Sequence, residues 1–225
     1  MTTPVITVDG PGGAGKGTLT YSLASKLGWH MLDSGALYRV TAQAAILDSI
    51  SLDDEDALAT IAADLDVRFE PAPDGLTQVI LRGVDITRDI RTEECGAVAS
   101  TVAAITPVRA ALLDRQRAFA KAPGLVADGR DMGTVVFPQA PLKIFLTASS
   151  EARAKRRQAQ LLAKGESVTL ARLLETIEER DARDRSREAS PLVPADDAVL
   201  IDSTALSADE VLQTALREAD QRRLL

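Results

Sequence analysis

The sequence predicts an α/β fold in which a mostly parallel sheet is covered by helices. Two observations lead to this prediction. Short apolar runs rich in β-branched residues recur along the chain, and most are followed by segments whose apolar residues repeat at helical spacing. Residues 5–8 form the first such run, and after a glycine cluster Leu19, Leu23 and Leu27 mark a helix that Gly28 ends. This alternation is typical of βα units with buried parallel strands.

The remaining elements can be placed in chain order. Further strands are expected at 29–32, 125–127, 142–146 and 199–201, and helices at 36–47, 54–65, 92–105 and 107–121. Ser149 or Ser150 should cap a long helix that Gly165 breaks, and Thr169 a second one that reaches about Arg187. Ser207 with Glu210 matches a capping box for a terminal helix.

The middle of the chain interrupts the βα rhythm. Short β-type runs at 67–70, 77–81 and 84–86 are separated by turn-forming residues, namely Pro71, Pro73, Asp74, Gly75 and Gly83. We therefore expect one domain over 1–225, with a core at 1–62 and 106–225 and a small antiparallel insert at 63–105.

Composition limits the classes of function. The net charge of −7 disfavours general nucleic-acid binding, which needs a basic face. The chain has 20 Arg and 6 Lys, a preference that suits compact anions in a cleft, although a codon bias explains it equally well. Cys95 is the single cysteine, so no intrachain disulfide is possible, and it is expected to be a small buried residue. No secretory signal or membrane-spanning run is recognisable, which predicts a cytoplasmic protein without a membrane partner.

A glycine-rich segment connects the first strand to the first helix, which is the context of a phosphate-binding loop. Its glycines allow successive N–H groups to point at phosphate oxygens, and the helix N-terminus adds positive potential. The expected contacts to a nucleoside triphosphate come from Gly10, Pro11, Gly12, Gly13, Ala14, Gly15, Lys16, Gly17 and Thr18.

One position of this loop departs from the common pattern. Gly17 follows Lys16 where a magnesium-binding hydroxyl is usual, and the hydroxyl comes one residue later, at Thr18. The Lys-Gly-Thr sequence resembles the loop of nucleoside monophosphate kinases, and no N-K-x-D guanine motif of GTPases is present.

Two further segments suggest an acceptor site at the same edge of the sheet. Ser34, Tyr38 and Arg39 follow the second strand, and Arg39 could clamp a phosphate; a capped helix start with a surface arginine is the alternative. Asp128 and Arg130 end the third strand, where Asp128 could hold a metal through water; a turn stabilised by aspartates is the alternative there.

The motifs G-P-G-G-A-G-K-G-T, L-D-S-G-A-L-Y-R and A-D-G-R-D-M-G-T-V-V-F-P together resemble the bacterial cytidylate kinase family. The similarity continues through E-R-D-A-R-D-R-S-R and P-L-V-P-A and covers nearly the whole chain. It implies a five-stranded parallel core, a mobile lid at about 157–168, a monomer, and transfer of phosphate from ATP to CMP or dCMP with Mg²⁺.

The resemblance also implies roles for individual residues. Those near the acceptor phosphate are Ser34, Arg39, Arg130 and Arg187; those around the sugar are Tyr38, Arg180 and Asp184; those that read the cytosine edge are Ser100, Arg109 and Asp131. Arg153, Arg156 and Arg157 resemble lid arginines, of which Arg153 and Arg157 are expected at ATP. The expected catalytic residues are Lys16, Arg130, Arg157 and Arg187, and the expected metal contacts are Thr18 and Asp128.

Helical spacing supports part of this assignment independently. Arg180, Arg183, Asp184 and Arg187 fall within about 100° on one helix face, and an anionic ligand would offset the repulsion among the arginines. His30, the single histidine, is expected to be structural rather than a general base. Two alternatives remain: a P-loop kinase for another small acceptor, and a nucleotide-binding regulator that hydrolyses slowly.

Overall fold

The computed structural model describes residues 3–71, 77–163 and 165–225, so the predicted turn residues Pro73, Asp74 and Gly75 lie outside the described part. The chain divides into two compact units. The first consists of the residues up to Asp33 together with Gln116–Leu225, and the second of Ser34–Arg115. The predicted insert at 63–105 lies within the second unit, whose bounds are wider.

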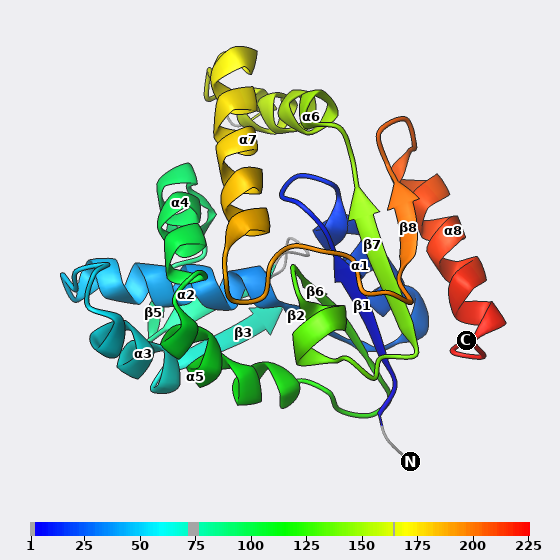
Figure 1. Cartoon of the computed structure of the whole chain (residues 1–225), viewed down its shortest axis with the longest axis horizontal. Helices are drawn as coiled ribbons and strands as arrows, with labels where there is room; N and C mark the ends of the chain where they lie inside the picture. Colours follow the sequence, from blue (N-terminus) through cyan, green and yellow to red (C-terminus); the bar gives the residue numbers. More distant parts are fainter. Residues whose placement is uncertain (1–2, 72–76, 164) are drawn as a thin grey trace. The chain divides into compact units, whose positions relative to one another are not determined.

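The first unit contains a five-stranded parallel sheet in the order β2-β6-β1-β7-β8 (Figure 1). The predicted α/β fold is therefore confirmed. The strands are β1 (Val5–Asp9), β2 (His30–Asp33), β6 (Leu125–Gly129), β7 (Leu142–Thr147) and β8 (Val199–Asp202). The central strand β1 is buried throughout, because both faces of the sheet are covered. In such sheets ligands bind beyond the carboxyl ends of the strands.

The helices of this unit are α1 (Lys16–Leu27), α6 (Ser150–Ala163), α7 (Leu170–Ser186) and α8 (Ala208–Gln221). Apolar residues of α1 and α8 pack with β1, β6, β7 and β8 in one core, which contains Leu19, Leu23, Val211 and Ala215. The capping box at Ser207 and Glu210 is present as predicted. These contacts fix α1, and with it the glycine-rich loop, at the carboxyl end of β1.

The second unit contains α2 (Ser34–Leu47), α3 (Glu55–Ala63), α4 (Glu93–Val102), the 3-10 turn η1 (Asp89–Arg91) and most of α5 (Thr106–Arg117). Its antiparallel sheet consists of β3 (Val67–Pro71), β4 (Thr77–Leu81) and β5 (Val84–Asp85), in that order. The small antiparallel sheet predicted from the turn residues is therefore confirmed.

The sequence did not predict one element of the first unit. Residues Met132–Val136 form a π-helical turn, η2, directly after Asp131. Several helices also end two to four residues earlier than predicted, for example α5 at Arg117 rather than near Lys121.

Within the described residues no single helix has the length and hydropathy of a membrane span. Helices α4 and α5 reach both only when they are taken together, across a bend of 100°.

Candidate active site

The glycine-rich loop adopts a backbone that other residues rarely allow. Gly10, Gly13 and Gly15 have φ values of 146°, 80° and 99°. A Cβ atom on Gly10 would lie 1.9 Å from the carbonyl oxygen of Leu146 in β7. The loop therefore requires glycine at its start, which keeps the backbone close to the sheet edge.

Lys16 is buried inside this loop. Its Nζ donates a hydrogen bond to the Pro11 carbonyl at 3.1 Å and lies 3.8 Å from the Asp128 carboxylate at the end of β6. Burial lowers the pKa of Lys16, and the neighbouring Arg130 lowers it further. Burial raises the pKa of Asp128, although Lys16 acts in the opposite direction. A polyanion bound at the loop would favour the charged form of Lys16.

Gly17 and Thr18 follow Lys16 at the start of α1. A Cβ atom on Gly17 would lie 3.7 Å from Oδ2 of Asp128, so Gly17 faces this carboxylate directly. Thr18, the next residue, is exposed, as Gly17 is. No group of three or more His, Cys, Asp and Glu side chains suited to a metal ion occurs among the described residues. A buried carboxylate beside a phosphate loop still fits Mg²⁺, which commonly takes one or two carboxylates plus phosphate oxygens and water.

Two arginines extend over the phosphate loop. A Cβ atom on Gly12 would lie 3.6 Å from Nη2 of Arg130 and 3.7 Å from Nη1 of Arg180. Arg130 also pairs with Asp184 of α7, at 2.9 Å between Nε and Oδ2. Burial acts to raise the pKa of Asp184, but the pair with Arg130 and the charges of Arg180 and Arg187 together lower it below its ordinary value. Positive charge is thus concentrated where phosphates would bind.

Arg153, expected at ATP, is fully engaged with the protein. Its side chain is 3% exposed and makes a bidentate pair with Asp181 of α7, at 3.0 and 2.6 Å. It also donates to the carbonyls of Gly12, at 3.2 Å, and Ala148, at 3.0 Å. In this structure Arg153 therefore connects the phosphate loop with α6 and α7.

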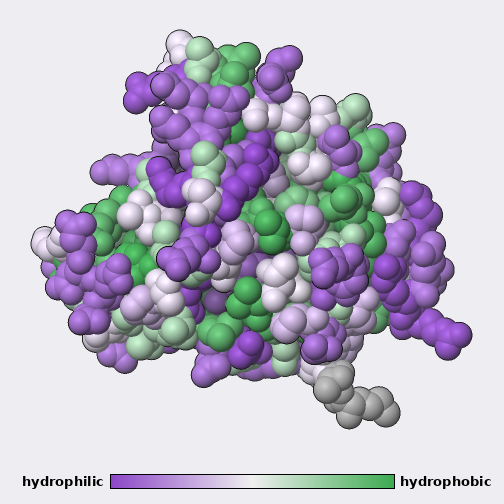
Figure 2. All heavy atoms as spheres, in the orientation of Figure 1, coloured by the Kyte–Doolittle hydropathy of each residue, from purple (hydrophilic) through white to green (hydrophobic). Residues whose placement is uncertain are grey.

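The other expected residues of the first unit have different surroundings. Arg156 donates to the carbonyl and hydroxyl of Ser203 beyond β8, whereas Arg157 contacts Gln160 of its own helix at 3.2 Å. Arg187 is not on the α7 face but forms its C-cap, and its Nε donates to the Ser190 carbonyl. The exposed surface over α6 and α7 is mostly hydrophilic (Figure 2).

The second unit brings other expected acceptor-site residues together. Ser34 is the buried first residue of α2, and the guanidinium of Arg109 lies 5.5 Å from the ring centre of Tyr38. Nη1 of Arg39 donates to the carbonyls of Ile90, at 2.6 Å, and Thr92, at 3.1 Å. A Cβ on Gly96 would lie 2.8 Å from Arg39 Nη2, so this small residue makes room for the guanidinium.

Ser100 lies on α4, and its side chain is buried. It is 5% exposed, and its hydroxyl has no hydrogen-bond partner within residues 3–71, 77–163 and 165–225. A buried hydroxyl of this kind calls for an explanation, and a polar ligand is one. Cys95 on the same helix is buried, which raises the pKa of its thiol, as expected for an unreactive cysteine.

Sequence reasoning missed Asp9 at the end of β1. Its carboxylate accepts the N–H groups of Met132 and Gly133, each at 2.8 Å. The only signal was an acidic residue that directly follows a buried apolar strand and precedes the loop.

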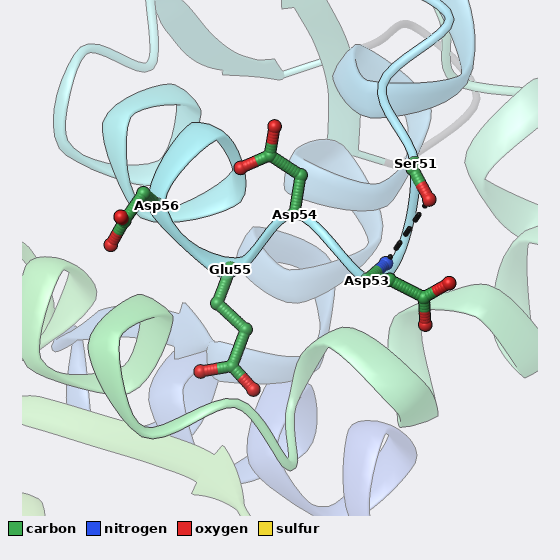
Figure 3. A pocket seen from close by; sticks show the side chains of 5 residues that line it. All are labelled: Ser51, Asp53, Asp54, Glu55 and Asp56. Atoms are coloured by element: carbon green, nitrogen blue, oxygen red, sulfur yellow. Dashed lines mark hydrogen bonds between the residues drawn. The ribbon is translucent and has the colours of Figure 1, made fainter.

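Two other features are not assigned to the candidate site. His30 is exposed at the start of β2, the end of the strand opposite to Asp33, and contacts the Ala122 carbonyl at 2.9 Å, in line with a structural role. In the second unit, Figure 3 shows a hollow lined by Ser51, Asp53, Asp54, Glu55 and Asp56, whose carboxylates point away from one another. Its negative charge does not suit a nucleotide.

The matching family model and the most similar curated relatives point to one family. The family model described as cytidylate kinase matches residues 6–221. A cytidylate kinase from Serratia proteamaculans (strain 568) is 61% identical over 220 residues, covering 98% of this chain and 96% of the relative. One from Stutzerimonas stutzeri (strain A1501) is 60% identical, with 98% and 97% covered. Among solved structures, a gluconokinase from Sinorhizobium meliloti 1021 aligns over 98% of this chain and 93% of its own at 17% identity, with a TM-score of 0.48.

Proposed function

The chain belongs to the cytidylate kinase family, and on this premise we propose that it transfers the γ-phosphoryl group of ATP to CMP or dCMP. The products are ADP and CDP or dCDP. The bond between the γ-phosphorus and the β–γ bridging oxygen breaks, and a new bond forms to a phosphate oxygen of the acceptor. The reaction is reversible because one phosphoanhydride replaces another.

The observation that carries the proposal is the group of cations around the phosphate loop. Lys16 is buried in the loop, and the guanidinium groups of Arg130 and Arg180 lie over Gly12. Asp128 lies 3.8 Å from Lys16, and Asp184 pairs with Arg130 at 2.9 Å, which holds these two cations beside the loop. Such a cluster is stabilised by a bound polyanion, and it neutralises the charge that builds up during phosphoryl transfer.

The transfer needs no general base. The acceptor phosphate has a second pKa near 6 and is largely dianionic at neutral pH. Catalysis then consists of positioning the two nucleotides and neutralising charge. We assign these tasks to Lys16, Arg130, Arg157 and Arg187.

For the acceptor we propose the following roles. Ser34, Arg39, Arg130 and Arg187 hold its phosphate, Tyr38, Arg180 and Asp184 its sugar, and Ser100, Arg109 and Asp131 its base. The buried hydroxyl of Ser100 supports the base-reading role, because a cytosine edge offers both donors and acceptors. ATP is bound by the loop at residues 10–18, with Arg157 and Arg153 beside it.

Mg²⁺ is part of the proposal. Asp128 would hold it, through water, and Thr18 is the nearest loop hydroxyl in sequence. When bound, the ion neutralises phosphate charge and helps to align the phosphates. A cytoplasmic location and a monomeric state are also proposed.

Steady-state assays test the acceptor. CMP should stimulate ADP formation by orders of magnitude over AMP, GMP or no acceptor. Stimulation by another acceptor instead would indicate a different P-loop kinase, and slow hydrolysis without any acceptor effect would indicate a nucleotide-binding regulator.

The base-reading role is tested by Asp131→Ala. The preference for CMP over UMP should collapse while ATP binding survives, and the exposed Asp196→Ala serves as the matched acidic control in the same unit. Retained preference in Asp131→Ala would remove Asp131 from this role.

A further inference from the structure

Asp9 connects two backbone segments of the first unit, the phosphate loop and the turn η2. It is the last residue of β1 and directly precedes Gly10, the first residue of the phosphate loop. It is 5% exposed, so its carboxylate is withdrawn from solvent. The two carboxylate oxygens accept one hydrogen bond each, Oδ1 from Met132 N–H and Oδ2 from Gly133 N–H, both at 2.8 Å.

These two amides are the first of the π-helical turn η2, which starts immediately after Arg130 and Asp131. The first N–H groups of a helical turn have no partner within the turn. Asp9 supplies that partner from another strand, and the Asp131 carbonyl accepts from Val135 N–H at 2.9 Å to close the turn. The backbone that leads out of Asp131 is therefore held by Asp9.

Packing around Gly133, which donates the second of these hydrogen bonds, leaves little room for a side chain. A Cβ atom on Gly133 would lie 2.9 Å from Oγ1 of Thr7, 3.1 Å from Cδ of Lys143 and 3.3 Å from Oδ2 of Asp9. Glycine at this position lets the turn approach β1 closely enough for both hydrogen bonds. The same carboxylate thus sets the distance between the phosphate-loop strand and the turn.

We propose that Asp9 is a positioning residue that holds the Arg130–Asp131 turn in register with the phosphate loop. It touches neither nucleotide. Its effect reaches the acceptor through Arg130, proposed above at the CMP phosphate, and Asp131, proposed above at the base, so this inference rests on the proposed function. Loss of the two hydrogen bonds should shift both side chains while the glycine-rich loop, held by its own contacts to β7 and α1, keeps its geometry.

Asp9→Asn tests this proposal with little change of volume. Its amide group still accepts one N–H but opposes the other with its own donor. We expect the KM for CMP to rise by about tenfold to hundredfold, the loss typical of a charge-assisted hydrogen bond, and the preference for CMP over UMP to fall by about tenfold or more. The KM for ATP should stay within about threefold.

Thr7→Val is the matched control. Thr7 lies two residues earlier on the same strand and contacts the same turn, yet within the described part of the chain its buried hydroxyl has no hydrogen-bond partner. Thr7→Val should keep the wild-type KM for CMP, KM for ATP and preference for CMP over UMP. If Asp9→Asn raised the KM values for ATP and CMP equally, or changed only the unfolding midpoint, the positioning role would be refuted.

Should Asp9→Asn fail to fold, Gly133→Ala replaces it, because the added methyl group pushes the turn away from the same carboxylate. The same selective loss for CMP is expected, and an unselective loss would refute the proposal. The activity of the wild type with CMP tests the proposed function. The role of Asp9 is tested separately, by the ratio of the variant's kinetic constants to those of the wild type.

Discussion

At the scale of single residues, Lys16 combines a binding role with a buried environment. Burial and the neighbouring Arg130 lower its pKa, so the free enzyme loses this positive charge at a lower pH than an exposed lysine would. Since kcat/KM reports the ionisation of the free enzyme, we expect kcat/KM for ATP to decline as the pH rises, with an apparent pKa well below the value of about 10.4 for free lysine.

The control for this measurement is kcat, which reports the bound complex. Phosphate oxygens around Lys16 stabilise its charged form, so the decline of kcat should begin at a higher pH. Lys16→Arg should move the decline of any remaining kcat/KM upwards, because a guanidinium stays charged. An unchanged profile in Lys16→Arg would assign the titration to another group.

Residues that belong to a contiguous motif could be located from sequence, and residues that act through tertiary contacts could not. The loop glycines were identified because their spacing alone specifies their backbone. Asp9 was missed because its partners, Met132 and Gly133, are more than 120 residues away. Arg153 was assigned to ATP because it resembles a lid arginine of the family, whereas its pair with Asp181 depends on how α6 meets α7.

At the scale of elements, α6 and α7 form a helix pair that Arg153 connects to the phosphate loop. Arg153→Gln should lower the free energy of unfolding by about 3–5 kcal/mol, because the buried Asp181 would lose its countercharge. Arg157, on the same helix, donates a solvent-exposed hydrogen bond to Gln160 and is the matched comparison. Arg157→Gln should change stability by less than about 0.5 kcal/mol and lower kcat. Urea unfolding and steady-state kinetics measure both effects, and similar stability losses in the two variants would contradict this division.

Element boundaries were predictable where a local signal exists. Gly28 ends α1, Thr169 caps α7, and Ser207 with Glu210 caps α8, all as expected from neighbouring residues. The π-helical turn η2 has no such signal. Its first amides bond to Asp9 rather than to a neighbouring cap, so its geometry depends on a strand from the other end of the sequence.

At the scale of the whole molecule, the arginine-rich but acidic composition now has a structural explanation. Several arginines are paired with aspartates inside the first unit, as in Arg130 with Asp184 and Arg153 with Asp181. The chain can therefore keep a net charge of −7 while it presents positive charge at the phosphate loop. Sequence composition could not distinguish this arrangement from codon bias, because only the fold brings the partners together.

The buried carboxyl of Asp9 should make the free energy of unfolding depend on pH. Burial raises the pKa of Asp9 to about 6, against the hydrogen bonds from Gly133 and Met132, which lower it; the charge of Asp131 raises it and that of Lys16 lowers it. The native state therefore binds a proton more tightly than the unfolded chain, whose aspartates titrate near 3.9. Between about pH 4 and 6 this group makes the fold less stable as the pH rises, and the full cost is present above pH 6.

A shift of about two units corresponds to about 2–3 kcal/mol. Other carboxylates, such as Asp184, have lowered pKa values and act in the opposite direction, so the difference between wild type and Asp9→Asn is the quantity to measure. In urea titrations, the stability of the wild type relative to this variant should fall by about 2–3 kcal/mol from pH 4 to pH 7, whereas Thr7→Val should run parallel to wild type. A pH-independent difference for Asp9→Asn would mean that Asp9 titrates normally. The expected result would show that the fold accepts a destabilising charge at the point where the phosphate loop meets the Arg130–Asp131 turn, as is common where function and stability compete.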